Sequence, residues 1–422
     1  MPDESIRFTG GGAGSRRAVI GICVAPGLDR ATGVLTAVSG RGLECCVEVQ
    51  ATARRDGLGD IVALFNRLTG DGSVPAGVLH RLAGQMTDVA TALVRDLAPA
   101  ARFEDVLAVG VHEPGLWHFS ADDAPARIGV LDAARLAEAT GLTVIDDFPA
   151  RDLAQGGQGG PVEALAQWVL LAHPRQCRLL IDLGHTTRMT YLPPSIGKGA
   201  ADHVIAMDVG PGMALLDRLA AQLTEGRFSF DPGGTLAVQG RRIPQLLDRL
   251  LAAPEFQEPP PRWHPQGIAP DWFLDHSIRA ALESGWSIRD LLCTATHLIA
   301  ESIARAVTRH IPPFPPLREL VFTGGGQQNG LLLREIARRL PDVEGLRVDS
   351  LGIRSRDLSA LAAAVLTVMH LDQVPQTRPF ITGTDAPRLL GRLTPGTPKQ
   401  WQSLLRRIHE HSPSMMSLRS AV

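Results

Sequence analysis

The sequence has little lysine, few cysteines and no long apolar run. Lysine occurs only at Lys198 and Lys399, and neither follows a G-x-x-x-x-G, so a Walker-type phosphate loop is absent and a catalytic lysine is not expected. The five cysteines are scattered without metal-ligand spacing, which is typical of reduced core thiols. The apolar runs are far shorter than a membrane span, and the N-terminal residues lack the apolar core of a signal peptide. We therefore predict a cytoplasmic protein without membrane contact.

The charge balance excludes a further class of partner. The net charge is −2 across 422 residues, so no electrostatic case exists for nucleic-acid binding. A hydrophobic content of 44% and a mean hydropathy of +0.04 describe an ordinary globular protein. The length is sufficient for two or three domains.

The order of the expected helices and strands repeats along the chain. The first part reads as strands at 18–24, 32–38 and 43–50, a helix at 78–97, a strand at 106–111, a helix at 132–140 and a strand at 143–145. The second reads as strands at 178–183, 188–192 and 203–208, helices at 212–223, 243–252, 272–284 and 288–308, a strand at 319–323, a helix at 329–340, a strand at 346–348 and a helix at 357–370.

Two such halves around a cleft are the architecture of the acetate and sugar kinase, Hsp70 and actin superfamily. By this analogy we predict an α/β fold of two ribonuclease H-like lobes. Residues 1–17 are expected to be a flexible tail. Residues 18–140 and 374–422 are assigned to the first lobe, and 141–373 to the second, which carries a helical and proline-rich insertion at 224–286.

One stretch, residues 151–161, concentrates the chemistry. It reads R-D-L-A-Q-G-G-Q-G-G-P, follows an expected buried strand, and precedes an expected helix at 162–172. Asp152 is thereby expected at the exit of the strand, and the glycines allow bare backbone N–H groups to approach a ligand. Such a carboxylate could remove a proton from a hydroxyl or from water while a phosphate is held nearby. The alternative is a flexible loop with a helix-capping aspartate.

Several motifs resemble those of the anhydro-N-acetylmuramic acid kinases, from about residue 18 to residue 398. Residues 147–161 are similar to the family pattern D-F-R-x-x-D-V-A-x-G-G-Q-G-A-P. Residues 208–217 resemble D-T-G-P-G-N-x-L-L-D, and residues 324–329 resemble G-G-G-x-x-N. Residues 110–118 match G-S-H-G-Q-T-x-x-H only in part, and residues 382–392 resemble the closing segment of the family.

This resemblance implies an ATP- and Mg²⁺-dependent kinase of 1,6-anhydro sugars in cell-wall recycling, active as a cytoplasmic homodimer. It implies that Asp152 is the general base: it takes a proton from the water that opens the anhydro ring, and the freed O6 accepts the γ-phosphoryl group. It further implies substrate contacts from His112, Arg151, Gln158 and Asp208. Nucleotide contacts are expected from Gly27, Asp29, Gly184, Gly210, Gly212, Gly324, Gly325, Gly326 and Asn329, and Asp208 or Asp29 could hold the metal through water.

Two phosphate-binding hairpins of the family are rewritten in this chain. Residues 21–30 replace G-x-M-S-G-T-S-x-D-G, with Pro26 removing a backbone donor and Arg30 replacing a glycine. Residues 182–190 replace N-I-G-G-I-A-N-L-T, with His185 at a glycine position and Arg188 at an asparagine position. Two accounts remain open: the new cationic side chains hold phosphate in an altered geometry, or the chain binds a sugar or nucleotide without phosphoryl transfer.

Structural roles compete with several of these assignments. His112 could be a structural histidine at a strand end, Asp208 could cap its turn, and Asp29 could be an ordinary turn residue. Gln158 could only satisfy the backbone of its loop, and the glycines at 324–326 could only permit close packing. Three tryptophans, Trp263, Trp272 and Trp286, are expected to be core or dimer contacts rather than sugar-stacking residues.

Overall fold

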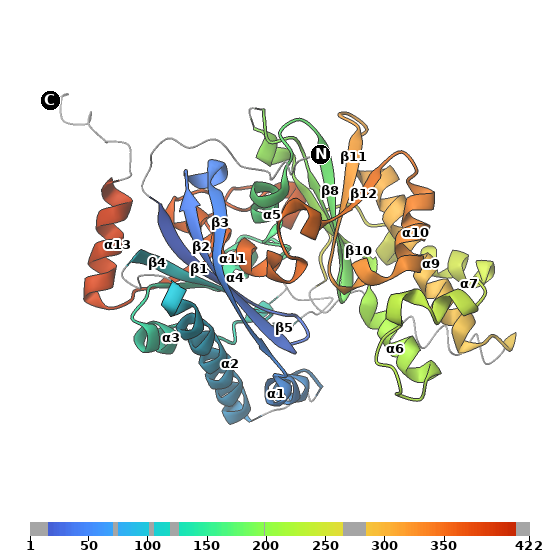
Figure 1. Ribbon diagram of the computed structural model, residues 1–422, viewed down its shortest axis with the longest axis horizontal. Coiled ribbons are helices and arrows are strands. Elements are labelled where there is room, and N and C mark those ends of the chain that lie inside the picture. Colours follow the sequence, from blue (N-terminus) through green and yellow to red (C-terminus); the bar gives the residue numbers. More distant parts are fainter. Residues whose placement is uncertain are drawn as a thin grey trace.

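The computed structural model describes residues 16–70, 75–100, 105–118, 126–197, 199–264 and 284–410. The helix expected at 272–284 falls almost wholly outside these residues, as does most of the tail expected at 1–17. Two β-sheets, one in each lobe, dominate the structure (Figure 1).

The first sheet has the strand order β13-β7-β4-β1-β2-β3, and the second has the order β10-β9-β8-β11-β12. The strands of the first sheet are β1 (Arg17–Val24), β2 (Arg30–Ser39), β3 (Cys46–Asp56), β4 (Val106–His112), β7 (Val144–Asp146) and β13 (Arg392–Thr394). Those of the second are β8 (Cys177–Leu183), β9 (Thr186–Leu192), β10 (Ile205–Pro211), β11 (Leu317–Thr323) and β12 (Glu344–Arg347). A small hairpin pairs β5 (Leu116–His118) with β6 (Ala126–Ile128).

Both sheets follow one plan. In each, the first strand pairs with the second and the second with the third in antiparallel fashion. The fourth strand then joins the first, and the fifth joins the fourth, in parallel. The predicted pair of like lobes is thereby confirmed.

The boundary expected after residue 140 falls one strand too early. Strand β7 pairs in parallel with β4 and antiparallel with β13, so it belongs to the first sheet. The physical reason is that β7 is fully buried and completes the sheet on which the first lobe's helices pack. The chain passes to the second lobe beyond this strand.

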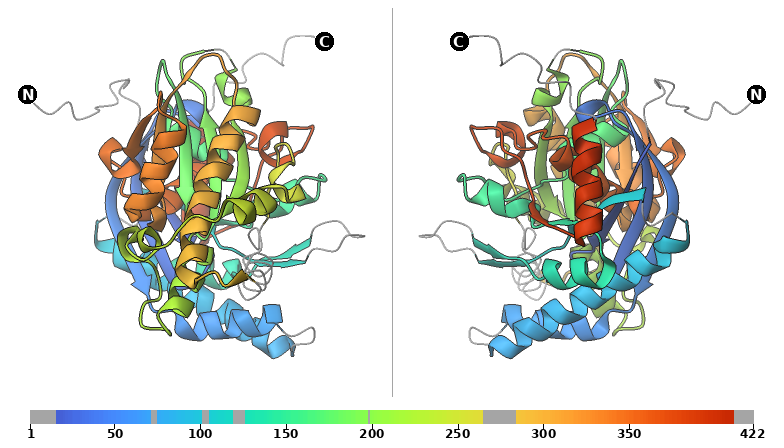
Figure 2. Two further views of the ribbon diagram at one scale, coloured as in Figure 1. Left: turned by 90° about the vertical axis from the view of Figure 1, so that its right-hand side faces the viewer. Right: turned by 90° about the vertical axis from the view of Figure 1, so that its left-hand side faces the viewer.

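The helices of the described residues fall into three groups around the three largest buried cores. The first lobe carries α1 (Gly59–Gly70), α2 (Ala76–Leu97) and α3 (Ala133–Thr140), and the second carries α6 (Met213–Leu223), α7 (Pro244–Leu251), α9 (Ile288–His310) and α10 (Gly330–Arg339). The remaining helices are α4 (Phe148–Leu153), α5 (Ala164–Leu171), α11 (Leu358–Leu371), α12 (Pro379–Thr382) and α13 (Pro398–Glu410). Both views of Figure 2 show α1 and α2 together at one end of the molecule.

The apolar face of α2 and the N-terminal caps of α3 and α9 show how local sequence determines these helices. The buried apolar side chains of α2 recur every three or four residues, which places them on one face against the first sheet. Asp132 caps α3 by accepting a hydrogen bond from the Arg135 N–H, as the sequence order of strand, polar residue and helix favours. Helix α9 begins with a capping box between Ser287 and Asp290.

Helices α5 and α11 lie between the two sheets and form the core that both lobes share. Helix α11 is almost entirely apolar and buried along its length. It approaches the first sheet so closely that a Cβ on Gly21 would lie 2.1 Å from the Ala360 carbonyl oxygen. A Cβ on Gly110 would lie 1.7 Å from Thr367 Oγ1. Glycine at these two strand positions is therefore what lets the helix seat on the sheet.

Candidate functional site

Asp152 is a fully buried carboxylate inside its own glycine loop. It lies on the short helix α4, not at the strand exit that the sequence favoured, because α4 intervenes after β7. Its Oδ2 accepts a hydrogen bond from the Gly159 N–H at 2.7 Å. A Cβ on Gly157 would lie 2.2 Å from Oδ2, so the loop can wrap around the carboxylate only with glycine there.

The second oxygen of this carboxylate is prepared for a ligand. Among the described residues, Asp152 Oδ1 is buried and has no partner at full hydrogen-bond geometry, although the Thr382 and Thr384 hydroxyls lie near the carboxylate. Burial raises the pKa of Asp152, against the effect of the Gly159 N–H and of the Thr382 and Thr384 hydroxyls. A carboxylate with an unused oxygen and a raised pKa is suited to accept a proton.

Gln158 ties the loop to two distant segments. Its backbone N–H donates to the Thr382 carbonyl oxygen at 2.8 Å, and its Nε2 donates to the Pro261 carbonyl oxygen at 2.9 Å. Its Oε1 is buried without a partner among the described residues. By contrast, Arg151 is on the exposed side of α4; burial lowers the pKa of His370, and the charge of Arg151 adds a smaller effect in the same direction.

His112 stands at the end of β4, beside Cys23 of β1. Its Nε2 lies 3.4 Å from Glu163 Oε1. Glu163 is buried at the start of α5. Burial raises the pKa of both Cys23 and Asp182, and the nearby Glu163 carboxylate adds to each shift. Glu163 was not among the predicted site residues, although a charged residue directly after the loop and before an apolar helix is an available signal.

Asp208 is fully buried on β10, and both of its carboxylate oxygens have protein partners. Arg188 Nε donates to Oδ1 at 2.9 Å, and the His264 N–H donates to Oδ2 at 2.7 Å. Arg188 lies opposite Asp208 on one neighbouring strand and opposite Asp182 on the other. The rewritten hairpin thus places one guanidinium between two carboxylates.

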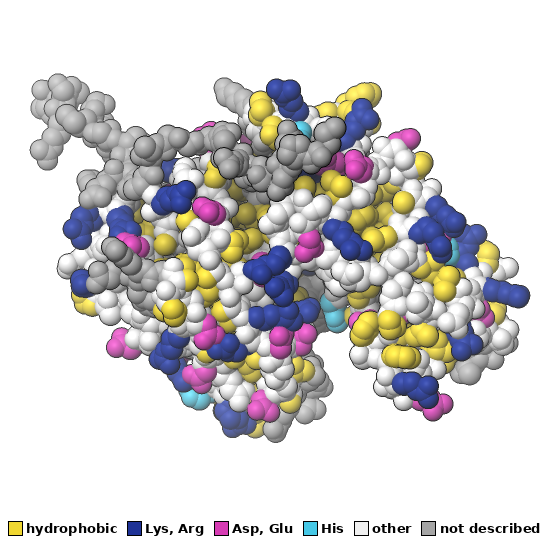
Figure 3. Space-filling model, in the orientation of Figure 1, with side chains coloured by type: hydrophobic (Ala, Val, Ile, Leu, Met, Phe, Trp, Pro, Cys, Tyr) yellow, Lys and Arg dark blue, Asp and Glu magenta, His cyan; other side chains and the backbone are white. Residues whose placement is uncertain are grey.

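Asp182 is a buried carboxylate on which charges from both rewritten hairpins act. Burial raises its pKa to about 6, and Arg188 and Arg30 act against this shift while Glu163 and Asp208 add to it. Arg30 belongs to the β1–β2 hairpin of the first lobe, so its charge acts across the space between the lobes. Figure 3 shows the surface hollowed between the lobes along its lower edge.

Apart from Gly27, the glycines predicted to contact nucleotide lie at one end of the second sheet. A Cβ on Gly212 would lie 2.4 Å from the Gly184 carbonyl oxygen, and a Cβ on Gly324 would lie 2.6 Å from Asp182 Oδ1. A Cβ on Gly326 would lie 2.6 Å from Leu183 Cβ, whereas Gly325 has open space around it. Close packing thus accounts for three of these residues, and Gly325 is open to an approaching ligand.

Two other predicted nucleotide contacts have structural partners. A Cβ on Gly210 would lie 2.9 Å from Phe256 Cε1, so this glycine makes room for a core ring. Asn329 caps α10, because its Oδ1 accepts a hydrogen bond from the Leu332 N–H at 3.0 Å. Their contacts with nucleotide stay predictions.

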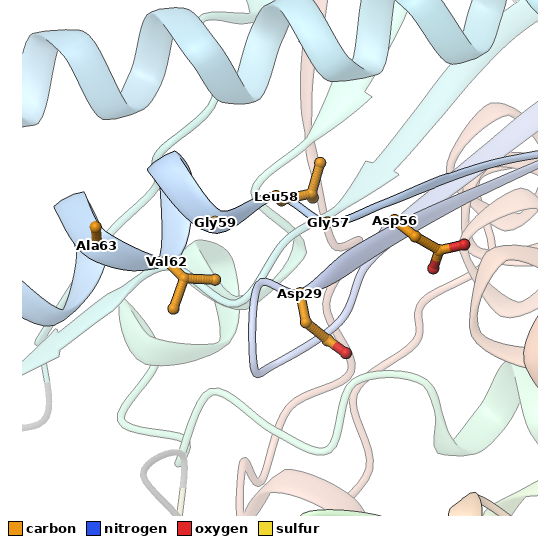
Figure 4. Close-up of a pocket in the computed structure, with 7 residues that line it drawn as sticks. All are labelled: Asp29, Asp56, Gly57, Leu58, Gly59, Val62 and Ala63. Atoms are coloured by element: carbon orange, nitrogen blue, oxygen red, sulfur yellow. The ribbon is translucent and has the colours of Figure 1, made fainter.

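Gly27 and Asp29 lie in the exposed β1–β2 turn. Asp29 lines a cavity of about 530 Å³ between this turn and α1. Figure 4 shows Val62 and Ala63 on the helix side of the cavity and the Asp29 and Asp56 carboxylates on the other. Of the predicted site residues, this cavity contains Asp29 alone, so it is separate from the loop around Asp152.

Across the described part of the chain, no group of three or more His, Cys, Asp and Glu side chains is arranged to hold a metal ion. The same residues include no helix that is both long enough and apolar enough to cross a membrane.

Two tryptophans lie against the glycine loop. A Cβ on Gly160 would lie 2.5 Å from the indole of Trp263, and a Cβ on Gly159 would lie 2.7 Å from Trp117. Neither tryptophan was expected there, because Trp263 is about a hundred residues from the loop in sequence. No local pattern could have revealed this contact.

The repeated strand order, with α5 and α11 packed between the sheets, defines the class as the two-lobed fold of acetate and sugar kinases, Hsp70 and actin. Residues 60–396 match the family model for anhydro-N-acetylmuramic acid kinase. The chain belongs to this family.

Curated relatives agree with this assignment. The anhydro-N-acetylmuramic acid kinase of Nitrosomonas europaea is 32% identical over 69% of this chain and 76% of its own length. The enzyme of that name from Acaryochloris marina is 29% identical over 89% of this chain and 99% of its own length.

Solved structures are more distant. Gluconate kinase from Lactobacillus acidophilus is 11% identical with a TM-score of 0.42, over 94% of this chain and 97% of that one. A ROK family glucokinase from Streptomyces griseus, in complex with glucose and AMPPNP, is 12% identical with a TM-score of 0.37, over 83% and 98% of the two chains. Family membership therefore depends on the sequence matches.

Proposed function

We propose that this protein transfers the γ-phosphoryl group of ATP to 1,6-anhydro-N-acetylmuramic acid, or a related anhydro sugar, and opens the anhydro ring in the same event. Family membership supports the kinase activity. The observation that carries the proposal is the carboxylate of Asp152, which is fully buried, has a raised pKa, and has one oxygen without a partner among the described residues.

In the proposed reaction, Asp152 accepts one proton from a water molecule. The water oxygen forms a bond to C1 of the sugar, and the C1–O6 bond breaks. O6 then forms a bond to the γ-phosphorus of ATP, whose bond to the β-phosphate oxygen breaks, so that ADP leaves. The Gly159 N–H donates to Oδ2 of Asp152, which holds the carboxylate in place and leaves Oδ1 for the water.

The nucleotide is proposed to bind at the end of the second sheet, near Gly325 and the turn at Gly184. Arg188 and Arg30 belong to the rewritten hairpins, their charges act on the buried Asp182, and they would contact the phosphates of the nucleotide. Mg²⁺ would neutralise phosphate charge when it enters with the nucleotide. Asp208 fits a metal poorly while Arg188 and the His264 N–H occupy its two oxygens.

The second candidate is a protein that binds the sugar without phosphoryl transfer. The closed Arg188–Asp208 pair favours it, because a triphosphate must compete with a fully buried carboxylate for the guanidinium. Pro26 adds to this, since the first hairpin lacks that backbone donor. His112, Arg151 and Gln158 would contact sugar in either case.

The proposal extends to the setting of the reaction. The resemblance to the family favours a role in cell-wall recycling, a cytoplasmic location and a homodimer. Size-exclusion chromatography with light scattering tests the last of these directly.

The test of the kinase proposal is to incubate the full chain with ATP, Mg²⁺ and 1,6-anhydro-N-acetylmuramic acid. We expect ADP and a sugar phosphate to form in equal amounts, measured by a coupled assay and by phosphorus NMR. Calorimetry with ATP and Mg²⁺ is the companion measurement. No ADP and no heat of ATP binding, together with heat on sugar addition, would replace the kinase by the second candidate.

A further inference from the structure

The segment 261–264 is attached firmly to the second lobe. The buried guanidinium of Arg262 donates through Nε to the Asp208 carbonyl oxygen and through Nη1 to the Glu255 and Glu258 carbonyl oxygens. In return, the Asp208 N–H donates to the Arg262 carbonyl oxygen at 2.7 Å. The next residue, Trp263, is therefore held in a defined place.

From that place Trp263 reaches the glycine loop. Three atoms of its indole would lie 2.5–2.7 Å from a Cβ on Gly160, so the ring lies directly on bare backbone. Trp117, from the β5–β6 hairpin, packs against it with ring centroids 4.6 Å apart at an interplanar angle of 72°. Each of the two indoles is only half-buried.

A buried charge network holds the second tryptophan. The guanidinium of Arg127, on β6, bonds to the carboxylates of both Glu113 and Asp147 and lies 5.7 Å from the centroid of the Trp117 ring. Asp147 begins the motif that contains Asp152, so one network connects the hairpin to the catalytic loop. The aromatic pair is built into the site rather than placed there by surface packing.

Buried polar atoms without a hydrogen-bond partner occur on Trp263 and on the glycine loop. Among the described residues, they include Trp263 Nε1, Gln158 Oε1 and Asp152 Oδ1; His264 Nδ1 also lacks a hydrogen bond but lies 4.0 Å from Asp208 Oδ2. The site therefore offers hydrogen-bond donors and acceptors beside the apolar face of an indole. A ligand with hydroxyls around a ring that also presents C–H groups satisfies both requirements, and this is the chemistry of a carbohydrate.

We propose that Trp263, backed by Trp117, is the wall of the sugar subsite. Its indole contacts the C–H face of the anhydro sugar, and its Nε1–H donates to a sugar oxygen. The role of Trp263 in turnover rests on the proposed kinase function, whereas its role in binding the sugar does not. It replaces the expectation that Trp263 is only a core or dimer contact.

The experiment compares Trp263→Ala and Trp263→Phe with the wild type in the assay with 1,6-anhydro-N-acetylmuramic acid. Trp263→Ala should raise the KM for the sugar about tenfold, from the loss of the ring contact and of the donor, and leave the KM for ATP unchanged. Trp263→Phe retains an aromatic ring, so its KM for the sugar should lie between those of the wild type and Trp263→Ala. Sugar-induced quenching of tryptophan fluorescence should disappear in both variants.

Trp286→Phe is the matched control. Trp286 belongs to the same insertion but packs against the core of the second lobe. It should leave both KM values and the quenching unchanged. Thermal unfolding of every variant checks that the fold is intact.

An unchanged or lower KM for the sugar in Trp263→Ala would overturn the inference, since the indole would then be neutral or obstruct the site. A change in the KM for ATP alone would also overturn it and assign the ring to nucleotide. If the wild type binds the sugar without turnover and Trp263→Ala abolishes binding, the proposed function fails and the subsite stands. No sugar binding by the wild type would overturn both.

Discussion

The loop around Asp152 and the strands around Asp208 each bury a carboxylate, but they treat it in opposite ways. Asp152 gives one oxygen to the Gly159 N–H, and its other oxygen has no partner in the described structure. Asp208 gives both oxygens to protein donors, one of them the guanidinium of Arg188. In the proposed reaction, the carboxylate on the sugar side therefore has an oxygen left for a ligand, whereas the carboxylate on the phosphate side is closed by internal charge pairing that a nucleotide would have to rearrange.

The largest expected effect tests the first half of this comparison. Asp152→Asn retains an acceptor for the Gly159 N–H but cannot take up a proton. Turnover should fall by about 10²–10⁴-fold with sugar affinity nearly unchanged, measured by ADP release and calorimetry. Asp248→Asn, at an exposed position on α7, is the control. Wild-type turnover in Asp152→Asn would show that the base has been misassigned.

The next largest effect concerns the ion pair between Arg188 and Asp208. Arg188→Ala leaves the fully buried Asp208 without its cation and should lower the free energy of unfolding by about 3 kcal/mol. Adding Asp208→Asn should recover most of this loss, because the buried charge is then gone. Urea denaturation measures both. Arg305→Ala, which removes a partly exposed pair with Glu301, should cost only about 0.5 kcal/mol. Equal losses in the two arginine variants would contradict the comparison.

A smaller effect tests how the loop holds Asp152. Gly157→Ala places a Cβ against the carboxylate, so the carboxylate or the loop must move, and turnover should fall about tenfold. Gly77→Ala, on α2 with only a distant arginine tip nearby, should leave turnover unchanged and raise the free energy of unfolding by about 0.5 kcal/mol. Full activity in Gly157→Ala would mean that the carboxylate position is not critical.

The smallest expected effects are two pH dependences, one of turnover through Asp152 and one of the KM for ATP through Asp182. Asp152 must be ionised to act as base, so its raised pKa predicts that turnover rises with pH along a limb above the usual carboxyl range. Asp182 becomes negative as pH passes about 6, so the KM for ATP should rise there. Asp182→Asn should remove only the second dependence, and it controls for titration of the nucleotide. If Asp182→Asn removed both pH dependences, Asp152 and Asp182 would not act independently, and the comparison would be contradicted.

Much of the fold was predictable because its signals are local. The face of α2, the capped start of α3 and the apolar strands follow from spacing and end residues within one element. The repeat of the element order then predicted two lobes, which the two sheets confirm. The assignment of β7 failed at its boundary, because strand pairing is a contact between elements and leaves no mark in the strand itself.

The site divides along the same line. By itself the sequence determined that a carboxylate lies within a loop of glycines, since only residues without a Cβ permit the loop to close on Asp152. Only the tertiary structure decided which groups surround it. Gln158 Nε2 donates to the Pro261 carbonyl oxygen, 103 residues away in sequence. Trp263, two residues beyond Pro261, contacts the same glycine loop. Such contacts depend on how two separately built sheets dock through α5 and α11, and no short-range pattern encodes that docking.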